Sequence, residues 1–258
     1  MNTHGPRYTC YTSEFGDYEP IWPPHQPDPG VDYVLVSDTT SPPRGWTHRT
    51  IDPSRFKTSR LANRFQKMLF HEGLPASNVS LYIDANIRPV ASLLPLLERF
   101  DASGADIGLY RHYSRHSVRS EAKACLKRNK VENPEAVEPE LDFYESQGFP
   151  DNDGLWEGSI IVKRHDSHKL VAAMTEWWDL YSRFQTRDQF SLPYIIWKHH
   201  LEVFDLGQDP VGLPKPFVHL QHAHTTPRHR LARYLQARAP EGVFWESLQR
   251  AARSLGRI

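Results

Sequence analysis

Short apolar runs alternate with helical patterns along most of the chain. Runs rich in β-forming or apolar residues occur at residues 8–12, 32–37, 79–84, 105–110 and 158–163. Residues with helical spacing of their apolar positions separate these runs. Such alternation is typical of an α/β domain, in which helices cover both faces of a central, mostly parallel sheet.

The helical patterns give approximate element boundaries. We expect a short strand at residues 48–51 and helices at residues 53–72, 89–100, 118–127, 133–147, 170–181 and 188–198. From about residue 207 the chain becomes rich in proline and arginine, which favours one or two amphipathic helices. We therefore predict a domain at residues 1–206 and a helical, basic extension at residues 207–258. The extension is expected to pack on the domain or on a partner, with binding to an anionic surface as the alternative.

Composition narrows the class of protein. The 258 residues are 39% hydrophobic and 24% charged, as in ordinary globular proteins. No apolar run approaches the roughly 18 residues of a membrane span, and the first seven residues contain no apolar stretch of a secretory signal. These features predict a soluble, cytoplasmic protein.

Charge and cysteine content exclude other classes. Basic and acidic residues balance at 31 each, so no global field attracts nucleic acid. Cys10 and Cys125 are far apart and lack CxxC spacing, which argues against a zinc knuckle or a disulfide scaffold. We expect both to be buried thiols.

Three polar residues follow predicted strands. Asp38, Asp84 and Arg111 lie at carboxyl ends of apolar runs, where ligands bind in open α/β sheets. Asp84 and Asn86 are two residues apart, so a carboxylate and an amide oxygen could bind a hard cation such as Mn²⁺ or Mg²⁺. Capping of the next helix is the structural alternative for Asp84.

Further charged residues fit a nucleotide-sugar enzyme. Arg60, Arg64 and Lys67 share one face of a predicted helix. They could neutralise a departing nucleoside diphosphate, or form a solvated face. Glu157 and Asp188 are candidate carboxylates for an oxocarbenium-like centre. The alternatives are a solvated loop acid for Glu157 and a helix N-terminal acid for Asp188.

Seven segments in this order resemble one known family. They are Tyr11–Tyr18, Tyr33–Asp38, Arg60–Lys67, Tyr82–Asn86, Ala105–His112, Glu157–His165 and Arg187–Ser191. The family is the glycosyltransferase-like family of bacteria and plants long catalogued as a domain of unknown function, with plant members linked to cell-wall and mucilage polysaccharides. The resemblance covers residues 8–200, and the order of the segments is more specific than any one of them.

The resemblance implies a GT-A-like fold and a role for each matched residue. Phe15, Gly16 and Asp38 would border the nucleoside, and Asp84 with Asn86 would hold Mn²⁺ or Mg²⁺ on the diphosphate. Arg60, Arg64 and Lys67 would bind the phosphates. Glu157 would lie on the acceptor side, with Arg187, Asp188 and Gln189 forming a late motif whose Asp188 faces the donor sugar. The remaining members of the same cleft would be Arg111, His112 and Arg115.

One departure affects the metal ligands. Many enzymes of this fold class have a second acidic residue where the chain has Asn86, and they often use a late histidine as a third ligand. The candidates here are His219, His222 and His224. Surface histidines are the alternative.

Three functions follow, in order of preference. The first is a hexosyl- or pentosyltransferase that moves a sugar from a nucleoside-diphosphate sugar to a glycan or other hydroxyl acceptor, metal-assisted through Asp84. The second is a metal-dependent hydrolase that uses the same centre. The third is a binding module that kept the fold and lost the chemistry.

Overall fold

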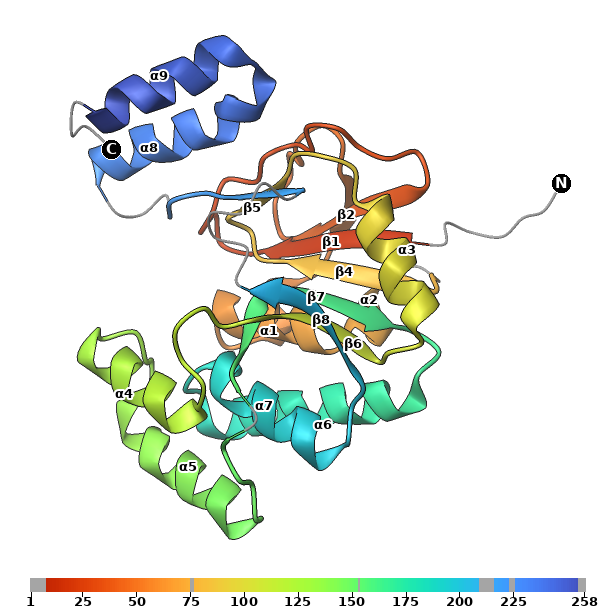
Figure 1. The fold of residues 1–258 in the computed structure, drawn as a ribbon, viewed down its shortest axis with the longest axis vertical. Coiled ribbons are helices and arrows are strands. Elements are labelled where there is room, and N and C mark those ends of the chain that lie inside the picture. The colour runs from red at the N-terminus through yellow and green to blue at the C-terminus, as the bar shows by residue number, and fades with distance from the viewer. Residues whose placement is uncertain (1–7, 75–76, 153, 209–215, 223–225, 255–258) are drawn as a thin grey trace, which may run out of the picture. The chain divides into compact units, whose positions relative to one another are not determined.

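The computed structural model describes residues 8–74, 77–152, 154–208, 216–222 and 226–254 (Figure 1). The chain divides into two compact units. The first comprises Met1–Asn63, Ile83–Leu97 and Pro210–Ile258, and the second comprises Arg64–Tyr82 and Glu98–Asp209.

The strands are β1 (Tyr8–Glu14), β2 (Val31–Ser37), β3 (Thr47–Thr50), β4 (Val79–Ile83), β5 (Ile87–Pro89), β6 (Ile107–Arg111), β7 (Trp156–Arg164), β8 (Val203–Gln208) and β9 (Phe217–His219). The α-helices are α1 (Ser59–Met68), α2 (Phe70–Gly73), α3 (Leu94–Ser103), α4 (Val118–Lys127), α5 (Val137–Ser146), α6 (His168–Phe184), α7 (Asp188–Lys198), α8 (Pro227–Arg238) and α9 (Val243–Ser254). Three short 3₁₀ helices are η1 (Pro53–Arg55), η2 (Pro134–Ala136) and η3 (Ala239–Glu241).

Seven strands form one sheet in the order β3-β2-β1-β4-β7-β6-β8. β1 pairs with β2, β2 with β3, and β6 with β8, all in parallel, whereas β7 runs antiparallel to β6. Every residue of β1 is buried, as expected for a parallel strand covered on both faces. The predicted α/β class, with a mostly parallel sheet flanked by helices, is confirmed.

The first unit also contains a small antiparallel pair. β5 pairs with β9, which places His219 opposite Ile87 and Phe217 opposite Pro89. α8 and α9 follow in the chain and lie side by side (Figure 1). Within the second unit, α6 packs against α7, and α7 packs against β7.

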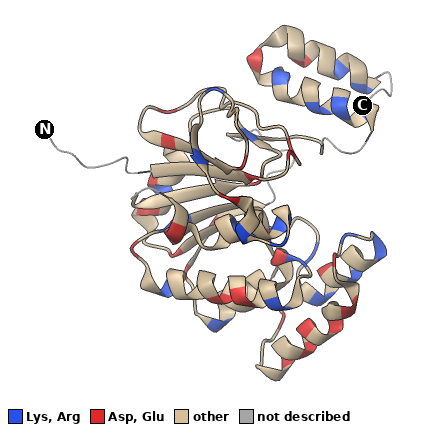
Figure 2. Ribbon diagram, turned by 180° about the vertical axis from the view of Figure 1, so that it is seen from behind, with Lys and Arg blue, Asp and Glu red and all other residues tan. Residues whose placement is uncertain are grey.

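Two helices of the second unit differ in charge, with mainly basic residues on α4 and acidic residues on α5. Figure 2 shows basic residues on α4 and acidic residues on α5. Nη1 of Arg119 on α4 lies 3.6 Å from Oε2 of Glu138, and Nη2 lies 3.3 Å from Oε2 of Glu145. These exposed ion pairs contribute little to stability.

Several predicted boundaries are wrong, and each has a physical reason. Residues 53–72 do not form one helix, because the chain leaves helical geometry at Leu69, where φ is −92° and ψ is 52°. Pro89 does not begin a helix, because its extended backbone pairs with Phe217 in a two-stranded ribbon. β8 and β9 were not predicted, since each short strand depends on a partner that is remote in the sequence.

Candidate functional site

The strongest polar cluster of the second unit surrounds Asp188, the first residue of α7. The side chain is buried, with an exposed fraction of 8%. Its Oδ2 atom lies 2.5 Å from Nζ of Lys67 and 3.3 Å from Nε of Arg64. Both cations belong to α1. The structure therefore brings Arg64 and Lys67 next to Asp188, which lies more than 120 positions later in the sequence.

The environment keeps Asp188 ionised. Burial alone would raise the pKa of its carboxyl, but the charges of Arg64 and Lys67 outweigh this effect and lower the pKa well below its ordinary value. A buried carboxylate with two cations is expensive to desolvate and adds little net stability. Such an arrangement is therefore a candidate for function.

Lys67 is buried and packs against two aromatic rings. Its side chain is 1% exposed, and its Nζ atom lies 5.2 Å from the ring centroid of Tyr82 and 6.0 Å from that of Trp177. A Cβ atom at Gly158 would lie only 3.3 Å from the same Nζ atom and 3.7 Å from Oδ2 of Asp188. A glycine in β7 thus leaves space beside the ion pair.

A second buried lysine supports this arrangement. Lys163 of β7 donates a hydrogen bond from Nζ to the carbonyl oxygen of Lys67. Burial and then the nearby charge of Lys67 lower the pKa of Lys163 well below its ordinary value. A lowered pKa reduces the cost of keeping a lysine in the interior.

Two contacts hold the start of α7 in place. Nε1 of Trp177 donates to the carbonyl oxygen of Asp188 and to Oγ of Ser191, both at 3.0 Å. Thr186, two residues before α7, donates from its hydroxyl to Glu140 of α5. Burial raises the pKa of Glu140 to about 7, although hydrogen bonds from Thr186 and Tyr144 oppose the shift.

A second cluster adjoins Gln189. Nε2 of Gln189 lies 3.5 Å from Oε2 of Glu157, and the other Glu157 oxygen lies 3.5 Å from Nε2 of His112. Nε2 of His112 also lies 3.8 Å from Oε2 of Glu121, and that oxygen forms an ion pair with Arg115. The structure therefore brings Gln189, Glu157, His112 and Arg115 together, with Glu157 still 18% exposed.

Arg111 and Arg187 have other partners. Nε of Arg111 donates to Asp205 at 2.7 Å, and its guanidinium lies 4.5 Å from the ring centroid of Trp156. Arg187 donates to the carbonyl oxygen of Lys130 at 3.3 Å. Its charge still contributes to the lowered pKa of Asp188.

In the first unit, the loop after β1 depends on Asp38. The backbone N–H of Gly16 lies 3.1 and 3.2 Å from the two carboxylate oxygens of Asp38. Gly16 has a φ of +71°, and a Cβ atom there would lie 2.7 Å from Oγ of Ser59. Glycine is therefore required at this position. Phe15 is buried, and Arg60 is an exposed residue of α1.

Asp84 and Asn86 form the turn between β4 and β5. Their side chains are half-buried, and the backbone N–H of Ile87 donates to the carbonyl oxygen of Asp84 at 2.9 Å. Nδ2 of Asn86 donates to the carbonyl oxygen of Leu220 at 3.2 Å. This bond fixes the amide and leaves acceptor capacity on its oxygen.

These two residues fit a hard divalent cation. A carboxylate and an amide oxygen are donors that Mg²⁺ and Mn²⁺ accept, provided that phosphate or water oxygens complete the coordination. Within residues 8–254, masked gaps aside, no three His, Cys, Asp or Glu residues gather as metal ligands.

The late histidines differ in their surroundings. His219 lies in β9 opposite Ile87, one residue before the contact between Leu220 and Asn86. Nδ1 of His222 instead lies 2.6 Å from Oε1 of Glu19, so this ring nitrogen already has a hydrogen-bond partner. His224 falls outside the described residues.

Sequence reasoning missed Trp177, Glu121, Glu140, Lys163 and Gly158. In the sequence, Trp177 looks like an ordinary core aromatic, and the two glutamates look like solvated helix acids. Only the three-dimensional contacts reveal that both glutamates are buried. A lysine at the end of an apolar run was the one available signal for Lys163.

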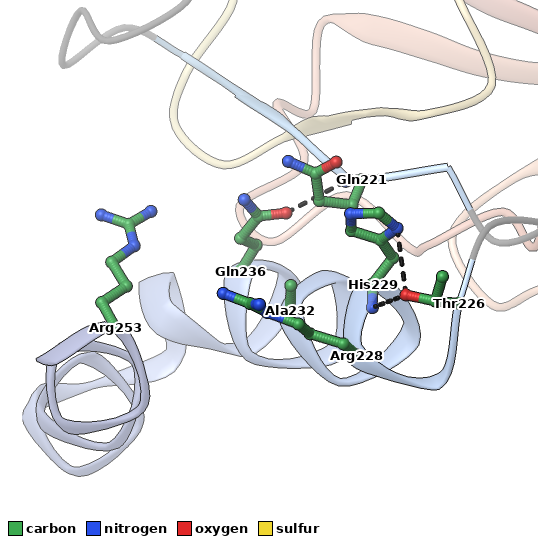
Figure 3. Close-up of a pocket in the computed structure, with 7 residues that line it drawn as sticks. All are labelled: Gln221, Thr226, Arg228, His229, Ala232, Gln236 and Arg253. Carbon is green, nitrogen blue, oxygen red and sulfur yellow. Dashed lines mark hydrogen bonds between the residues drawn. The ribbon is translucent and has the colours of Figure 1, made fainter. Parts of the chain in front are cut away.

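A separate pocket lies in the first unit, near the start of α8 (Figure 3). It has a volume of about 440 Å³ and is lined by Gln221, Thr226, Arg228, His229, Ala232, Gln236 and Arg253. None of the predicted site residues lines it. Both thiols, Cys10 and Cys125, are free and buried, as predicted.

Comparison with known proteins gives one family match. A model of the family described as TOD1/MUCI70, glycosyltransferase-like domain, matches residues 45–206. No curated protein sequence matches the chain. In the described part of the chain, no helix is long and apolar enough to cross a membrane.

Several solved glycosyltransferases resemble the chain weakly. Mouse xyloside xylosyltransferase 1 in its apo form has a TM-score of 0.46 and 12% identity, over 77% of this chain and 84% of that chain. The bifunctional glycosyltransferase WbbM has a TM-score of 0.46 and 14% identity, over 80% of this chain and 40% of that chain. An active-site mutant of LgtC has a TM-score of 0.46 and 11% identity, over 72% of this chain and 70% of that chain. Likenesses at this level identify no functional residue of the chain.

Proposed function

The chain belongs to the TOD1/MUCI70 glycosyltransferase-like family, whose model matches more than half of its length, and on this premise we propose that it is a metal-assisted glycosyltransferase. It moves a hexose or pentose from a nucleoside-diphosphate sugar to a glycan or other hydroxyl acceptor. The family identification made from the motifs is confirmed. The matched segment begins at residue 45 rather than 8, so Phe15, Gly16 and Asp38 lie outside it.

The observation that carries the proposal is the ionised, buried carboxylate of Asp188. Sugar transfer develops positive charge at the anomeric carbon, and a fixed carboxylate stabilises that charge without reorganising. The backbone contacts of Trp177 restrain the residue. Asp188 is the residue that faces the donor sugar in this proposal.

The two cations have different roles. Lys67 is fully buried on Asp188 and acts as a positioning residue. Arg64 is 23% exposed, so its guanidinium is a candidate for binding a donor phosphate. Arg60, which is exposed, is a second candidate for the phosphates.

The cluster around Glu157 suits an acceptor hydroxyl. Glu157 is partly exposed, and His112 and Gln189 lie beside its two carboxylate oxygens. A carboxylate held in this way can accept a proton from an attacking hydroxyl. Arg115 and Glu121 lie near the same ring nitrogen of His112, Nε2, and help to orient the ring.

The donor's diphosphate requires charge neutralisation. Asp84 and Asn86 would hold Mn²⁺ or Mg²⁺, which supplies Lewis-acid stabilisation of the leaving nucleoside diphosphate when bound. Phe15, Gly16 and Asp38 form a constrained loop that would border the nucleoside.

The test measures nucleoside-diphosphate release from a panel of nucleotide sugars in Mn²⁺, with and without hydroxylated acceptors. We expect acceptor-stimulated release, and at least about a hundredfold loss in Asp84→Ala and Asp188→Asn, as for other electrostatic catalytic groups. Asp142→Asn is the matched control, because Asp142 is an exposed acid on α5.

Two outcomes would count against the proposal. Equal release with and without every acceptor would instead support a metal-dependent hydrolase. Turnover by Asp84→Ala at the parent rate would remove that residue from the metal site.

A further inference from the structure

Large apolar side chains are exposed mainly on one pair of helices in the first unit. Among the described residues, seven such side chains are exposed, and five of them lie on α8 or α9. They are Leu231 (43% exposed), Tyr234 (41%), Val243 (73%), Phe244 (68%) and Leu248 (42%). No residue of α9 is buried. We call these five side chains the apolar patch.

Contacts show that the patch is continuous from one helix to the other. Phe244 and Leu248 are one turn apart on α9, and Leu231 and Tyr234 are neighbours on one face of α8. The ring of Trp245 lies 5.3 Å from that of Phe244 and 5.7 Å from that of Tyr234. Trp245 therefore links Phe244 of α9 to Tyr234 of α8.

The α8–α9 hairpin carries more basic than acidic side chains at its surface, with Arg228, Arg230, Arg238, Arg250 and Arg253 against Glu241 and Glu246. Arg238 pairs with Glu241 and Arg250 with Glu246, whereas Arg233 is buried and pairs with Glu19. Arg238 lies 5.7 Å from the ring centroid of Tyr234 and 4.8 Å from that of Trp245. Arg230 and Arg238 are each four residues from Tyr234, which places all three on one side of α8.

We propose that the α8–α9 hairpin binds the surface of an anionic lipid membrane. The apolar patch inserts at the level of the headgroups, and the surrounding arginines contact lipid phosphates. Charge complementarity favours this occupant, because arginine-rich helices with exposed aromatic and aliphatic side chains match the charge and polarity of an anionic bilayer interface. Helices of 12 residues lie on the bilayer rather than span it.

Two of the hairpin's arginines line the pocket of Figure 3. Arg228 and Arg253 line it from α8 and α9, respectively. Electrostatic attraction decays over about 8 Å at physiological salt, and in this proposal these two arginines are among the residues that attract the bilayer. The hairpin lies outside residues 45–206, and the inference therefore stands independently of the proposed sugar transfer.

The test is co-sedimentation of the full chain with phosphatidylcholine vesicles that contain or lack phosphatidylglycerol. We expect binding only to the anionic vesicles and weaker binding in high salt. Phe244→Glu and Leu248→Glu each remove an exposed apolar side chain, and each should weaken binding at least about tenfold. Arg230→Gln should lower the salt dependence.

Tyr18→Glu is the matched control, because Tyr18 is 55% exposed and lies outside the hairpin. It should bind anionic vesicles like the parent. Circular dichroism establishes that each variant is folded. Absence of binding to the anionic vesicles would overturn the proposal. A dimer of the parent in light scattering that Phe244→Glu dissociates would also overturn it, because a second copy of the chain would then cover the patch.

Discussion

Asp188 carries a negative charge in a place where water cannot solvate it. Lys67 and Arg64 compensate for that charge, and Gly158 leaves room for the pair, because a Cβ atom there would lie 3.3 Å from Nζ of Lys67. Apolar residues of similar volume would stabilise the fold as well or better. The charges are therefore best explained by chemistry at this carboxylate.

Replacing Asp188 alone should be costly. Asp188→Asn leaves Lys67 buried without its carboxylate, which should lower the free energy of unfolding by about 3 to 5 kcal/mol. The double variant Lys67→Met/Asp188→Asn removes both buried charges and should recover most of that loss. Urea unfolding of the parent and both variants measures the difference.

Activity separates the structural role from the catalytic one. The double variant should regain stability yet remain inactive, because the carboxylate itself is missing. An active double variant would mean that Asp188 serves only to hold the fold.

At the scale of elements, α7 presents Asp188 because several other elements hold its first turn. Trp177 of α6 binds the backbone at Asp188, and Glu140 of α5 binds Thr186 just before the helix. Glu140 is buried and accepts hydrogen bonds from the hydroxyl groups of Thr186 and Tyr144. Burial disfavours the charged form of Glu140 and raises its pKa to about 7.

This shift makes stability depend on pH. The unfolded chain releases the Glu140 proton near its ordinary pKa of 4.5, whereas the folded chain holds it until about pH 7. Stability from this group is therefore complete below pH 4.5 and falls as the pH rises to 7, by about 3 kcal/mol.

Glu140→Gln keeps the hydrogen-bonding shape and removes the titration. Its free energy of unfolding relative to the parent should increase from pH 5 to pH 8 by about 3 kcal/mol. Urea unfolding at each pH measures this difference. A constant difference across the range would show that Glu140 does not titrate there.

Local signals predicted some elements better than others. α4 and α7 begin at the predicted residues, and Ser117 supplies the N-cap of α4. β5, β8 and β9 were missed because three to six residues carry too little periodicity, and pairing with remote strands decides their conformation. The charged face of α1 was predicted, but the burial of Lys67 was not, since it depends on Asp188.

At the scale of the whole molecule, the alternation of apolar runs with helical patterns predicted the α/β class, and the order of the motifs predicted the family. The apolar runs also predicted that Asp38 and Asp84 follow strands, and the structure confirms this for β2 and β4. The sequence could not show that Arg64, Lys67 and Asp188 form one cluster, because α1 and α7 are far apart in the chain. It also could not show that the hydrophobic side of α9 is left exposed.

Thermal stabilisation by nucleoside diphosphates tests the central claim most directly, since a ligand that binds only the folded state raises its stability. We predict that at least one nucleoside diphosphate raises the Tm of the parent in Mn²⁺ or Mg²⁺ and not in chelator. Asp84→Ala should lose that increase, whereas Asp142→Asn should keep it. If no nucleoside diphosphate changes the Tm of the parent with either metal, the chain does not bind the donor that the proposed transfer requires.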